Sequence, residues 1–335
     1  MSVSVLTRAA PRRCAVSGDK RVTIQRSGCT RTSGLYGYSD RIATPGYGPR
    51  MTSHPWGTVG PVVRKRLLAR ELRSLREQAG LPLGAAMIAL GCSRAKITHL
   101  ETARNLPAEG DLAILSRLYG VPEALDDLLE LRAGATERGW WTSYRLSPIV
   151  SECIGLESDA VTVERFTLEI VPGMLQTESY ARAVAQGGTL TSDEVERYVE
   201  ARLRRGDRLR RGDVTLSTVM SEGLLHRTVG MGDVGIEQLQ QLYDATAMPN
   251  VELHVLPFSA GTQWEMSRSF TLLTFSAGLL EPVAHQDQAD IDTVTENPAI
   301  VKNLQDRYTG LHAQALSGEE SAALIKQFAE KEVTS

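Results

Sequence analysis

The stretch LPLGAAMIALGCSRAKITHLE, residues 81–101, decides the fold of the segment around it. It contains two short runs with apolar residues at helical spacing, and Gly91 between them allows a sharp backbone turn. Ser93, two residues later, is a residue type that caps the start of a helix. The pattern therefore predicts a helix-turn-helix. The apolar positions that pack its two helices together are Ala86, Met87 and Leu90 in the first and Ile97 and Leu100 in the second.

The second helix of this motif has one face that the first helix does not cover. At about 100° per residue, Ala95, Thr98 and His99 lie opposite the apolar positions. Arg94 and Lys96 flank them. Small polar groups beside cations fit the base edges and phosphates of a DNA major groove. The residues that we expect on bases are Arg94, Ala95, Thr98 and His99, and those on phosphates are Ser93, Lys96 and Arg104.

Basic residues are concentrated around this motif, although the chain as a whole has a formal net charge of −3. Residues 64–104 contain nine Lys or Arg against three Asp or Glu. Phosphate binding favours such a local excess, because each neutralised phosphate releases counterions. We therefore expect a double-stranded DNA operator as partner; the alternative is a helical hairpin whose charged face is only solvated. The nine basic residues are Arg64, Lys65, Arg66, Arg70, Arg73, Arg76, Arg94, Lys96 and Arg104.

The chain of 335 residues is long enough for about two domains. Five short stretches with helical periodicity predict a helical bundle at residues 64–135. Residues 136–330 mix helical periodicity with strand-like runs, which predicts an α+β domain with a small sheet. The expected fold is therefore mostly α, with an N-terminal five-helix helix-turn-helix bundle followed by an α+β domain. The strand candidates are residues 214–220, 251–257 and 270–275.

The first 63 residues have the composition of a basic tail and arm without a core. Nine Lys or Arg stand against two Asp in the first 50 residues, with no sustained hydrophobic period. We therefore expect residues 1–63 to be disordered, and an alternative is that the true start is Met51. No run approaches the roughly 18 apolar residues of a membrane span. The expected location is cytoplasmic and nucleoid-associated.

Motifs that would indicate catalysis or metal binding are weak. A GxGxxG match lacks the strand that must directly precede it in a dinucleotide site, and one histidine near three aspartates is explained more simply by a polar turn. No nucleophile elbow surrounds Ser221. We therefore expect no enzyme, no cofactor and no metal site. The glycines are Gly230, Gly232 and Gly235, and the polar cluster is His285, Asp287, Asp290 and Asp292.

Aromatic and basic residues of the second domain are candidates for a pocket that receives a partner or ligand. Packing in the core near the linker is the alternative for the aromatic residues. For the arginines of residues 202–211, the alternative is pairing with acidic residues of the same helix. The pocket candidates are Trp140, Trp141, Tyr144, Arg202 and Arg205.

Several motifs together resemble a known group of proteins. Residues 64–135 are similar to the Xre or lambda-repressor-like helix-turn-helix domain. Residues 136–330 resemble the C-terminal domain of the WhiJ-like, antitoxin-like transcriptional regulators of actinobacteria. The motifs that carry this second resemblance include RGWW at residues 138–141, VPGMLQTESYARAV at 171–184, RLRRGDRLRR at 202–211 and NVELHVLPFSAG at 250–261.

The resemblance implies a homodimeric regulator of transcription that binds DNA, often encoded beside a small partner protein as in toxin-antitoxin systems. Several positions depart from the pattern, including three in the helix-turn-helix. Pro82 and Leu83 replace the usual Thr-Gln, and His99 stands where Arg is usual. The alternative function is therefore an antitoxin-like protein-interaction module with weak or vestigial DNA binding.

Overall fold

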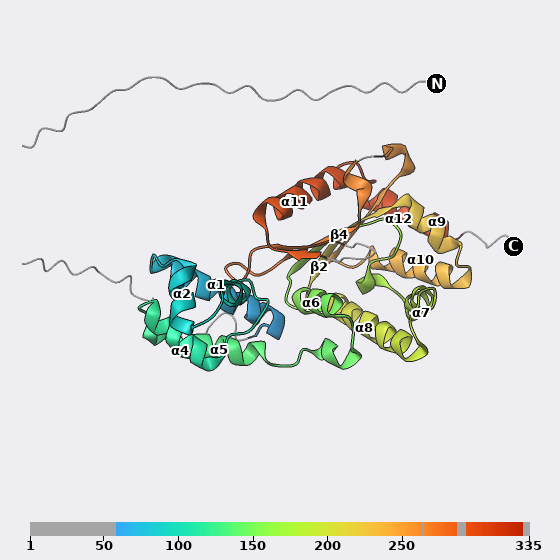
Figure 1. The fold of residues 1–335 in the computed structure, drawn as a ribbon. Helices are drawn as coiled ribbons and strands as arrows, with labels where there is room; N and C mark the ends of the chain where they lie inside the picture. Colours follow the sequence, from blue (N-terminus) through green and yellow to red (C-terminus); the bar gives the residue numbers. More distant parts are fainter. Residues whose placement is uncertain (1–57, 263, 287–292, 331–335) are drawn as a thin grey trace, which may run out of the picture. The chain divides into compact units, whose positions relative to one another are not determined.

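The computed structural model describes residues 58–262, 264–286 and 293–330. The basic tail, Met51 and three residues of the polar cluster, Asp287, Asp290 and Asp292, lie outside this part of the chain. Within it, helices dominate the N-terminal part, and a six-stranded sheet flanked by helices follows (Figure 1). The predicted fold class, mostly α with a following α+β region, is confirmed. No helix in the described ranges combines the length and apolar character needed to cross a membrane.

The N-terminal part is a bundle of short helices around α1. The helix α1 begins at Pro61, and not near Arg66 as the apolar spacing predicts. Proline is favoured at the first helical position because its missing N–H needs no partner there, and Val63 in the added turn is buried. The helices are α1 (Pro61–Gln78), α2 (Leu83–Leu90), α3 (Arg94–Glu101), α4 (Glu109–Leu118) and α5 (Leu125–Ala135).

The turn between α2 and α3 has the geometry that its sequence predicts. Gly91 has a φ of 58°, in the left-handed region that disfavours residues with a Cβ. Ser93 caps α3, and its Oγ accepts a hydrogen bond of 3.3 Å from the backbone N–H of Lys96. Ile97 and Leu100 are buried, with 1% and 2% of their surface exposed. These contacts confirm the predicted helix-turn-helix.

The C-terminal part contains seven further helices among the described residues. Two of them, α8 and α12, begin with the capping boxes of Thr191 with Glu194 and Ser317 with Glu320. A 3-10 turn at Trp140–Tyr144 connects the bundle to this part. The helices are α6 (Pro148–Glu157), α7 (Glu178–Gln186), α8 (Ser192–Arg210), α9 (Glu222–Val229), α10 (Asp233–Ala245), α11 (Pro298–His312) and α12 (Gly318–Ala329).

The sheet is mixed, with strand order β3-β2-β1-β4-β5-β6. The strands β1, β2 and β3 are parallel, and helices connect them, whereas β4, β5 and β6 continue the sheet in antiparallel pairs. The three predicted strands correspond to β2, β3 and β4, and the sequence analysis missed the others. The strands are β1 (Thr162–Thr167), β2 (Thr215–Ser221), β3 (Val251–Leu256), β4 (Phe270–Thr274), β5 (Val283–Gln286) and β6 (Thr293–Thr295).

The two faces of the sheet have separate cores. On one face, Phe166, Val219 and Phe270 pack against α11 through residues that include Leu304 and Tyr308. On the other face, alternate strand residues pack against the helices that connect the parallel strands and against α12. Figure 1 shows α11 on one side of the strands and α6, α8 and α10 on the other. The C-terminal part is therefore a layered structure with the sheet in the middle.

The connection between α11 and α12 and the start of α12 form hydrogen bonds with Val255 on the outer side of the edge strand β3. The backbone N–H of Leu316 donates to the carbonyl of Val255 at 2.9 Å. The backbone N–H of Val255 donates to the Oγ of Ser321, also at 2.9 Å. Backbone groups at this point of the sheet edge therefore find partners within the chain.

The GxGxxG glycines have a packing role. Gly230 follows α9, Gly232 precedes α10 with a φ of 65°, and Gly235 lies in the first turn of α10. A Cβ on Gly235 would come within 1.7 Å of the carbonyl oxygen of Thr228, so this residue permits close contact between the two helices. The motif follows a helix and not a strand, unlike a dinucleotide-binding turn.

Candidate nucleic-acid interface and arginine pocket

The reading face, which we define as Arg94, Ala95, Thr98 and His99 on α3, is open among the described residues. Arg94, Ala95 and Thr98 are exposed, and His99 is half-buried. The opposite side of α3 packs on α1 and α2 through Ile97 and Leu100. The bundle thus presents the residues that the sequence analysis assigns to base contacts.

Two of the three residues expected on phosphates already have partners in the chain. Ser93 serves as the cap of α3. Lys96 is half-exposed, and its Nζ lies 2.8 Å from the Oδ2 of Asp111, whose hydrogen bond raises the pKa of Lys96. Arg104 is exposed. A phosphate would therefore have to draw Lys96 away from Asp111, whereas Arg104 is accessible.

A buried ion pair fixes the position of α3 on α1. Arg76 donates from Nε to Oε1 of Glu101 at 2.6 Å and from Nη2 to Oε2 at 2.8 Å. The side chains are 10% and 8% exposed, respectively. The hydrogen bond from Arg76 to Glu101 raises the pKa of Arg76. The bidentate geometry sets the direction in which the reading face points.

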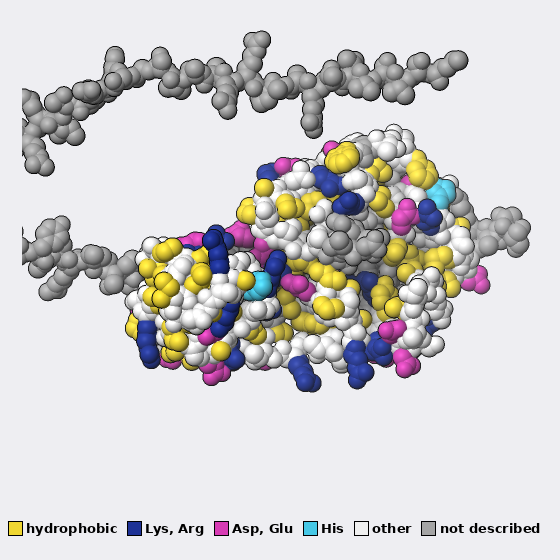
Figure 2. Space-filling model, viewed as in Figure 1, with side chains coloured by type: hydrophobic (Ala, Val, Ile, Leu, Met, Phe, Trp, Pro, Cys, Tyr) yellow, Lys and Arg dark blue, Asp and Glu magenta, His cyan; other side chains and the backbone are white. Residues whose placement is uncertain are grey.

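The basic excess of residues 64–104 is smaller at the surface than in the sequence. Arg76 forms an ion pair with Glu101, and Arg66 forms ion pairs with Glu152 and Glu296. Arg64 donates a hydrogen bond to the carbonyl of Val59. Figure 2 shows Lys and Arg side chains scattered among acidic and apolar ones on the visible face of the N-terminal helices. Counting charges along the sequence therefore overestimated the cations available to DNA. The arginines of this range that are exposed are Arg70, Arg73, Arg94 and Arg104.

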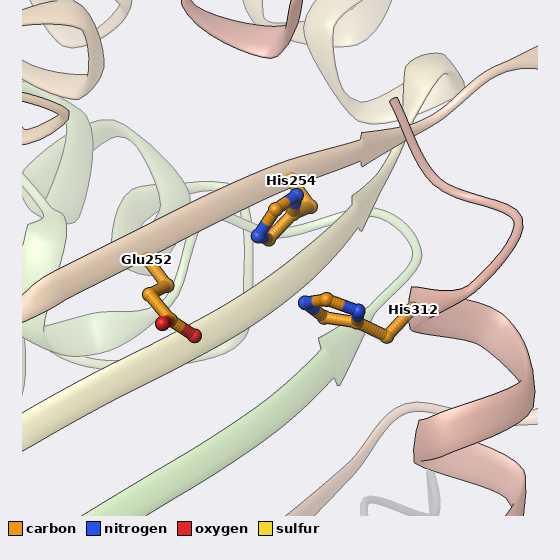
Figure 3. Close-up of side chains that lie close together, drawn as sticks. All are labelled: Glu252, His254 and His312. Atoms are coloured by element: carbon orange, nitrogen blue, oxygen red, sulfur yellow. The ribbon is translucent and has the colours of Figure 1, made fainter. Parts of the chain in front are cut away.

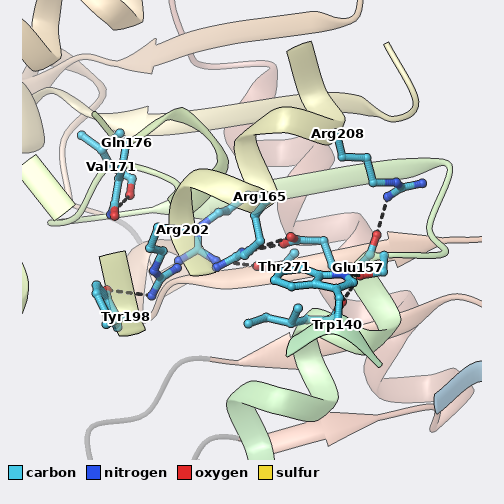
Figure 4. A network of polar contacts seen from close by, with 12 residues as sticks. Trp140, Glu157, Arg165, Val171, Gln176, Tyr198, Arg202, Arg208 and Thr271 are labelled. Atoms are coloured by element: carbon cyan, nitrogen blue, oxygen red, sulfur yellow. Dashed lines mark hydrogen bonds and ion pairs between the residues drawn. The ribbon is translucent and has the colours of Figure 1, made fainter. Parts of the chain in front are cut away.

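A second site lies between α6, α8 and the sheet. It is a cavity of about 340 Å³, which we call the arginine pocket because Arg165, Arg202 and Arg205 line it (Figure 4). Arg202 and Arg205 come from α8 and were predicted, whereas Arg165 comes from β1. Apolar lining is supplied by Val150, Ile154, Ile170, Val171 and Leu273.

The arginine pocket holds more positive than negative charge. Arg205 donates to both carboxylate oxygens of Glu157, at 2.7 and 2.6 Å, and these side chains are 13% and 11% exposed. Arg202 donates to the hydroxyl of Tyr198 at 2.8 Å and stacks 4.5 Å from the centre of that ring. Arg165 donates to the Oγ1 of Thr271 at 2.7 Å. Three guanidinium groups thus share one well-buried carboxylate, and the other acidic lining residue, Glu169, is exposed and pairs with Arg227.

The charges of the arginine pocket shift the pKa values of its members. Burial alone would raise the pKa of Glu157, but Arg205, with Arg202 and Arg165, outweighs burial and lowers it. Burial, followed by the charge of Arg205, lowers the pKa of Arg202. An arginine stays protonated in proteins, so the surplus positive charge persists. The buried Oε1 of Gln176, another lining atom, has no hydrogen-bond partner in the described structure.

The predicted aromatic residues form a separate cluster. Trp140 contacts Trp141 and Tyr144 edge to face, with ring centres 5.8 and 5.9 Å apart. Its Nε1 donates to the Oγ of Ser158, and Arg204 stacks on its ring. None of the three aromatic residues lines the arginine pocket. The structure therefore brings Arg202 and Arg205 together but not the aromatic residues with them.

The alternative of pairing within the helix holds for Arg210 of α8, which pairs with Asp207. It does not hold for Arg205 and Arg208. These two residues reach across to α6, where Arg205 pairs with the carboxylate of Glu157 and Arg208 donates to the backbone carbonyl of the same residue. Glu157 was missed because its partner is 48 residues away. A carboxylate inside the largely apolar segment of residues 148–157 is the signal that could have identified it.

Comparisons with known families match two separate segments of the chain. A family model described as Domain of unknown function (DUF5753) matches residues 150–327. A model described as Helix-turn-helix domain matches residues 67–129 and supports the predicted DNA-binding regulator. The comparisons with curated proteins and with solved structures found no match.

Proposed function

This chain belongs to the DUF5753 family, and we propose that it is a sequence-specific transcriptional regulator that binds operator DNA as a homodimer. The observation that carries this proposal is the open reading face on α3. In helix-turn-helix dimers, the two such helices enter successive major grooves about 34 Å apart. The proposal includes the Xre-type and WhiJ-like, antitoxin-like assignments, a nucleoid location, and the absence of an enzymatic role.

The DNA-binding proposal is tested by mapping bound DNA across the genome and measuring affinity on the sites found. We expect an inverted repeat with half-sites one helical turn apart. Fluorescence anisotropy should give at least about a 1,000-fold preference for this site over a scrambled duplex of the same composition. Equal affinity for the two duplexes would contradict sequence-specific binding.

We propose further that the C-terminal part receives a small anionic ligand in the arginine pocket. Surplus buried cations are unfavourable unless an anion compensates them. A carboxylate or phosphate group accepts paired hydrogen bonds from guanidinium groups, and the apolar walls fit an aliphatic or aromatic remainder. The volume of about 340 Å³ is within the range of small-molecule sites.

The helix α6 offers a route from this ligand to the DNA-binding bundle. Near its C-terminus, Glu157 holds Arg205 in the pocket. Glu152, on the same helix, pairs with Arg66 of α1. An anion that takes Arg205 from Glu157 would change the contacts of α6, and through Glu152 the position of α1. Ligand binding would thereby alter DNA affinity.

The ligand proposal is tested by thermal unfolding of the full chain with sodium octanoate or inorganic phosphate, compared with sodium chloride at equal ionic strength. We expect one of the two anions to raise Tm. Arg202→Met should abolish the increase, whereas Arg211→Met, an exposed residue on the same arginine-rich segment, should retain it. An unchanged Tm of the wild-type chain with both anions would refute the ligand proposal.

A second candidate function is an antitoxin-like interaction module. It is favoured because some cations of the bundle are already paired with carboxylates of the same chain. Lys96 and Arg76 are paired within the bundle. Co-purification of the small protein encoded nearby, together with no shift of any mapped DNA, would support this candidate. Strong operator binding by the chain alone would count against it.

A further inference from the structure

Three potential metal ligands meet at the edge of the sheet. Glu252 and His254 alternate on β3 and therefore project from the same face, and His312 is the last residue of α11, which covers that face. Their ligand atoms all lie within 4.8 Å of one another. Figure 3 shows the three side chains converging from the strand and the helix end. None of them lines the arginine pocket.

The ring of His254 is oriented for metal binding. Its Nδ1 lies 2.9 Å from the carbonyl oxygen of Leu316. A carbonyl can only accept a hydrogen bond, so Nδ1 carries a proton, and in the neutral ring Nε2 is then the nitrogen with the lone pair. A ligand histidine commonly donates its other ring N–H in this way, which fixes both the tautomer and the ring direction.

The other two side chains are also prepared for a cation. The Oε2 of Glu252 accepts a hydrogen bond of 2.9 Å from the Oγ of Ser217, which in turn accepts one of 2.9 Å from the hydroxyl of Tyr308. The ring of His312 lies edge to face with that of His254, with ring centres 4.3 Å apart, so the two imidazoles are already close neighbours.

We propose that Glu252, His254 and His312 bind one divalent transition-metal ion of the zinc class. Two imidazoles and a carboxylate suit zinc, and three protein ligands leave a fourth position for water. Tetrahedral ligands around zinc lie about 3.4 Å apart, so binding draws the three groups closer. Glu252 is exposed and can make this adjustment. A surface pocket of about 400 Å³ borders Glu252 and His254.

The bound ion would join Glu252 and His254 on β3 to His312 at the end of α11, which lies 58 to 60 residues further along the sequence. A ligand that binds only the folded chain stabilises it by mass action. Metal binding would therefore raise Tm independently of DNA and of the arginine pocket.

The test is a calorimetric titration of ZnCl₂ into the full chain after treatment with a chelator and dialysis. We expect one ion per chain at these residues and a rise in Tm. His312→Asn and Glu252→Gln should each weaken this binding at least tenfold. Ser217→Ala, which removes the hydrogen bond that orients Glu252, should weaken it about tenfold.

The matched control is His226→Asn, which removes an exposed histidine that also lies near a carboxylate, that of Glu222. This variant should bind zinc as the wild-type chain does. Circular dichroism of the metal-free variants shows whether they fold. If a histidine variant does not fold, Glu252→Gln, which changes an exposed residue, still tests the site. Unchanged zinc affinity in both Glu252→Gln and His312→Asn, or no micromolar binding by the wild-type chain, would overturn the proposal.

Discussion

At the scale of single residues, Glu101 has the largest expected effect on the stability of the bundle. Glu101→Ala would leave Arg76 buried without its carboxylate partner. We expect the free energy of unfolding to fall by about 3 kcal/mol, as for other broken buried pairs. Urea denaturation monitored by circular dichroism would measure the change.

The control for this prediction is Glu77→Ala. Glu77 pairs with Arg73 at 2.9 Å and lies 3.6 Å from the Nη2 of Arg76, but the side chains of Glu77 and Arg73 are 52% and 62% exposed. Pairs in water contribute little, so the expected loss is below about 1 kcal/mol. Equal losses in the two variants would show that the Arg76–Glu101 pair has no special role.

Arg94 is the residue of the reading face with the greatest expected influence on operator preference. A guanidinium on a guanine discriminates by about 1 to 3 kcal/mol against other bases. Arg94→Ala should therefore reduce the ratio of operator to scrambled-duplex affinity by roughly tenfold or more. Anisotropy titrations with both duplexes give this ratio, and an unchanged ratio would exclude Arg94 from base contacts.

Local spacing could predict the cap at Ser93 and the buried positions Ile97 and Leu100. The same spacing also placed Arg94 and Thr98 on the open side of α3. The partners of Arg66 could not be predicted, because Glu152 and Glu296 come from elements distant in the sequence. Residue roles that depend on the local chain were therefore predictable, and long-range ion pairs were not.

At the scale of elements, the capping boxes of α8 and α12 give a prediction about pH. Hydrogen bonds from Thr191 lower the pKa of Glu194, and those from Ser317 lower the pKa of Glu320. A carboxylate with a depressed folded-state pKa stabilises above its unfolded pKa, and this contribution is lost as pH falls through the folded pKa. The free energy of unfolding should therefore decrease as the pH falls from about 6 to about 3.

The double variant Glu194→Gln/Glu320→Gln keeps hydrogen-bond acceptors at both helix starts but cannot titrate there. Its stability should fall less over the same pH range than that of the wild-type chain. Chemical denaturation at several pH values would compare the two. Identical pH profiles would show that neither carboxylate contributes to acid sensitivity.

The predictability of an element depended on how regular its pattern is. The strand β3 alternates buried Val251 and Leu253 with the less buried Glu252 and His254, and it was predicted. The strand β1 was missed because Glu164 and Arg165 interrupt its apolar pattern. Arg165 lines the arginine pocket. The charged residue that this candidate site requires therefore interrupts the apolar pattern by which β1 could have been predicted.

At the scale of the whole molecule, the distribution of exposed arginines predicts the salt dependence of DNA binding. Arg73, Arg94 and Arg104 are exposed, whereas Arg70 lies against the carbonyl of Gly278. A dimer that places these three arginines of each chain on phosphates or bases would show log affinity falling with log salt at a slope near −5. If all nine basic residues of residues 64–104 contacted phosphates in each chain, the slope would be much steeper.

The matched variants for this prediction are Arg104→Gln and Arg211→Gln. Arg104→Gln should reduce the slope by about two in a dimer, because one phosphate contact is lost per chain. Arg211, exposed in the C-terminal part, should leave it unchanged. Affinities between about 50 and 200 mM salt would measure both slopes. An unaltered slope for Arg104→Gln would remove this residue from the interface.

The predicted boundary near residue 135 is crossed by contacts that the sequence does not reveal. The backbone N–H of Gly60 donates to Asp159 at 2.9 Å, and Arg66 pairs with residues of the C-terminal part. A single apolar cluster contains Val63 and Leu156 from the two sides. Composition separated a basic from an acidic segment, but only the fold shows how α1 and α6 are joined.

The hydrogen bonds that Leu316 and Ser321 make with Val255 have a consequence for solubility. An unprotected outer strand is a template on which a neighbouring molecule can add its own strand, and growth of this kind leads to fibrils. Here the chain occupies that template itself, immediately after α11. Folding of the last two helices therefore also protects the molecule against self-association through β3.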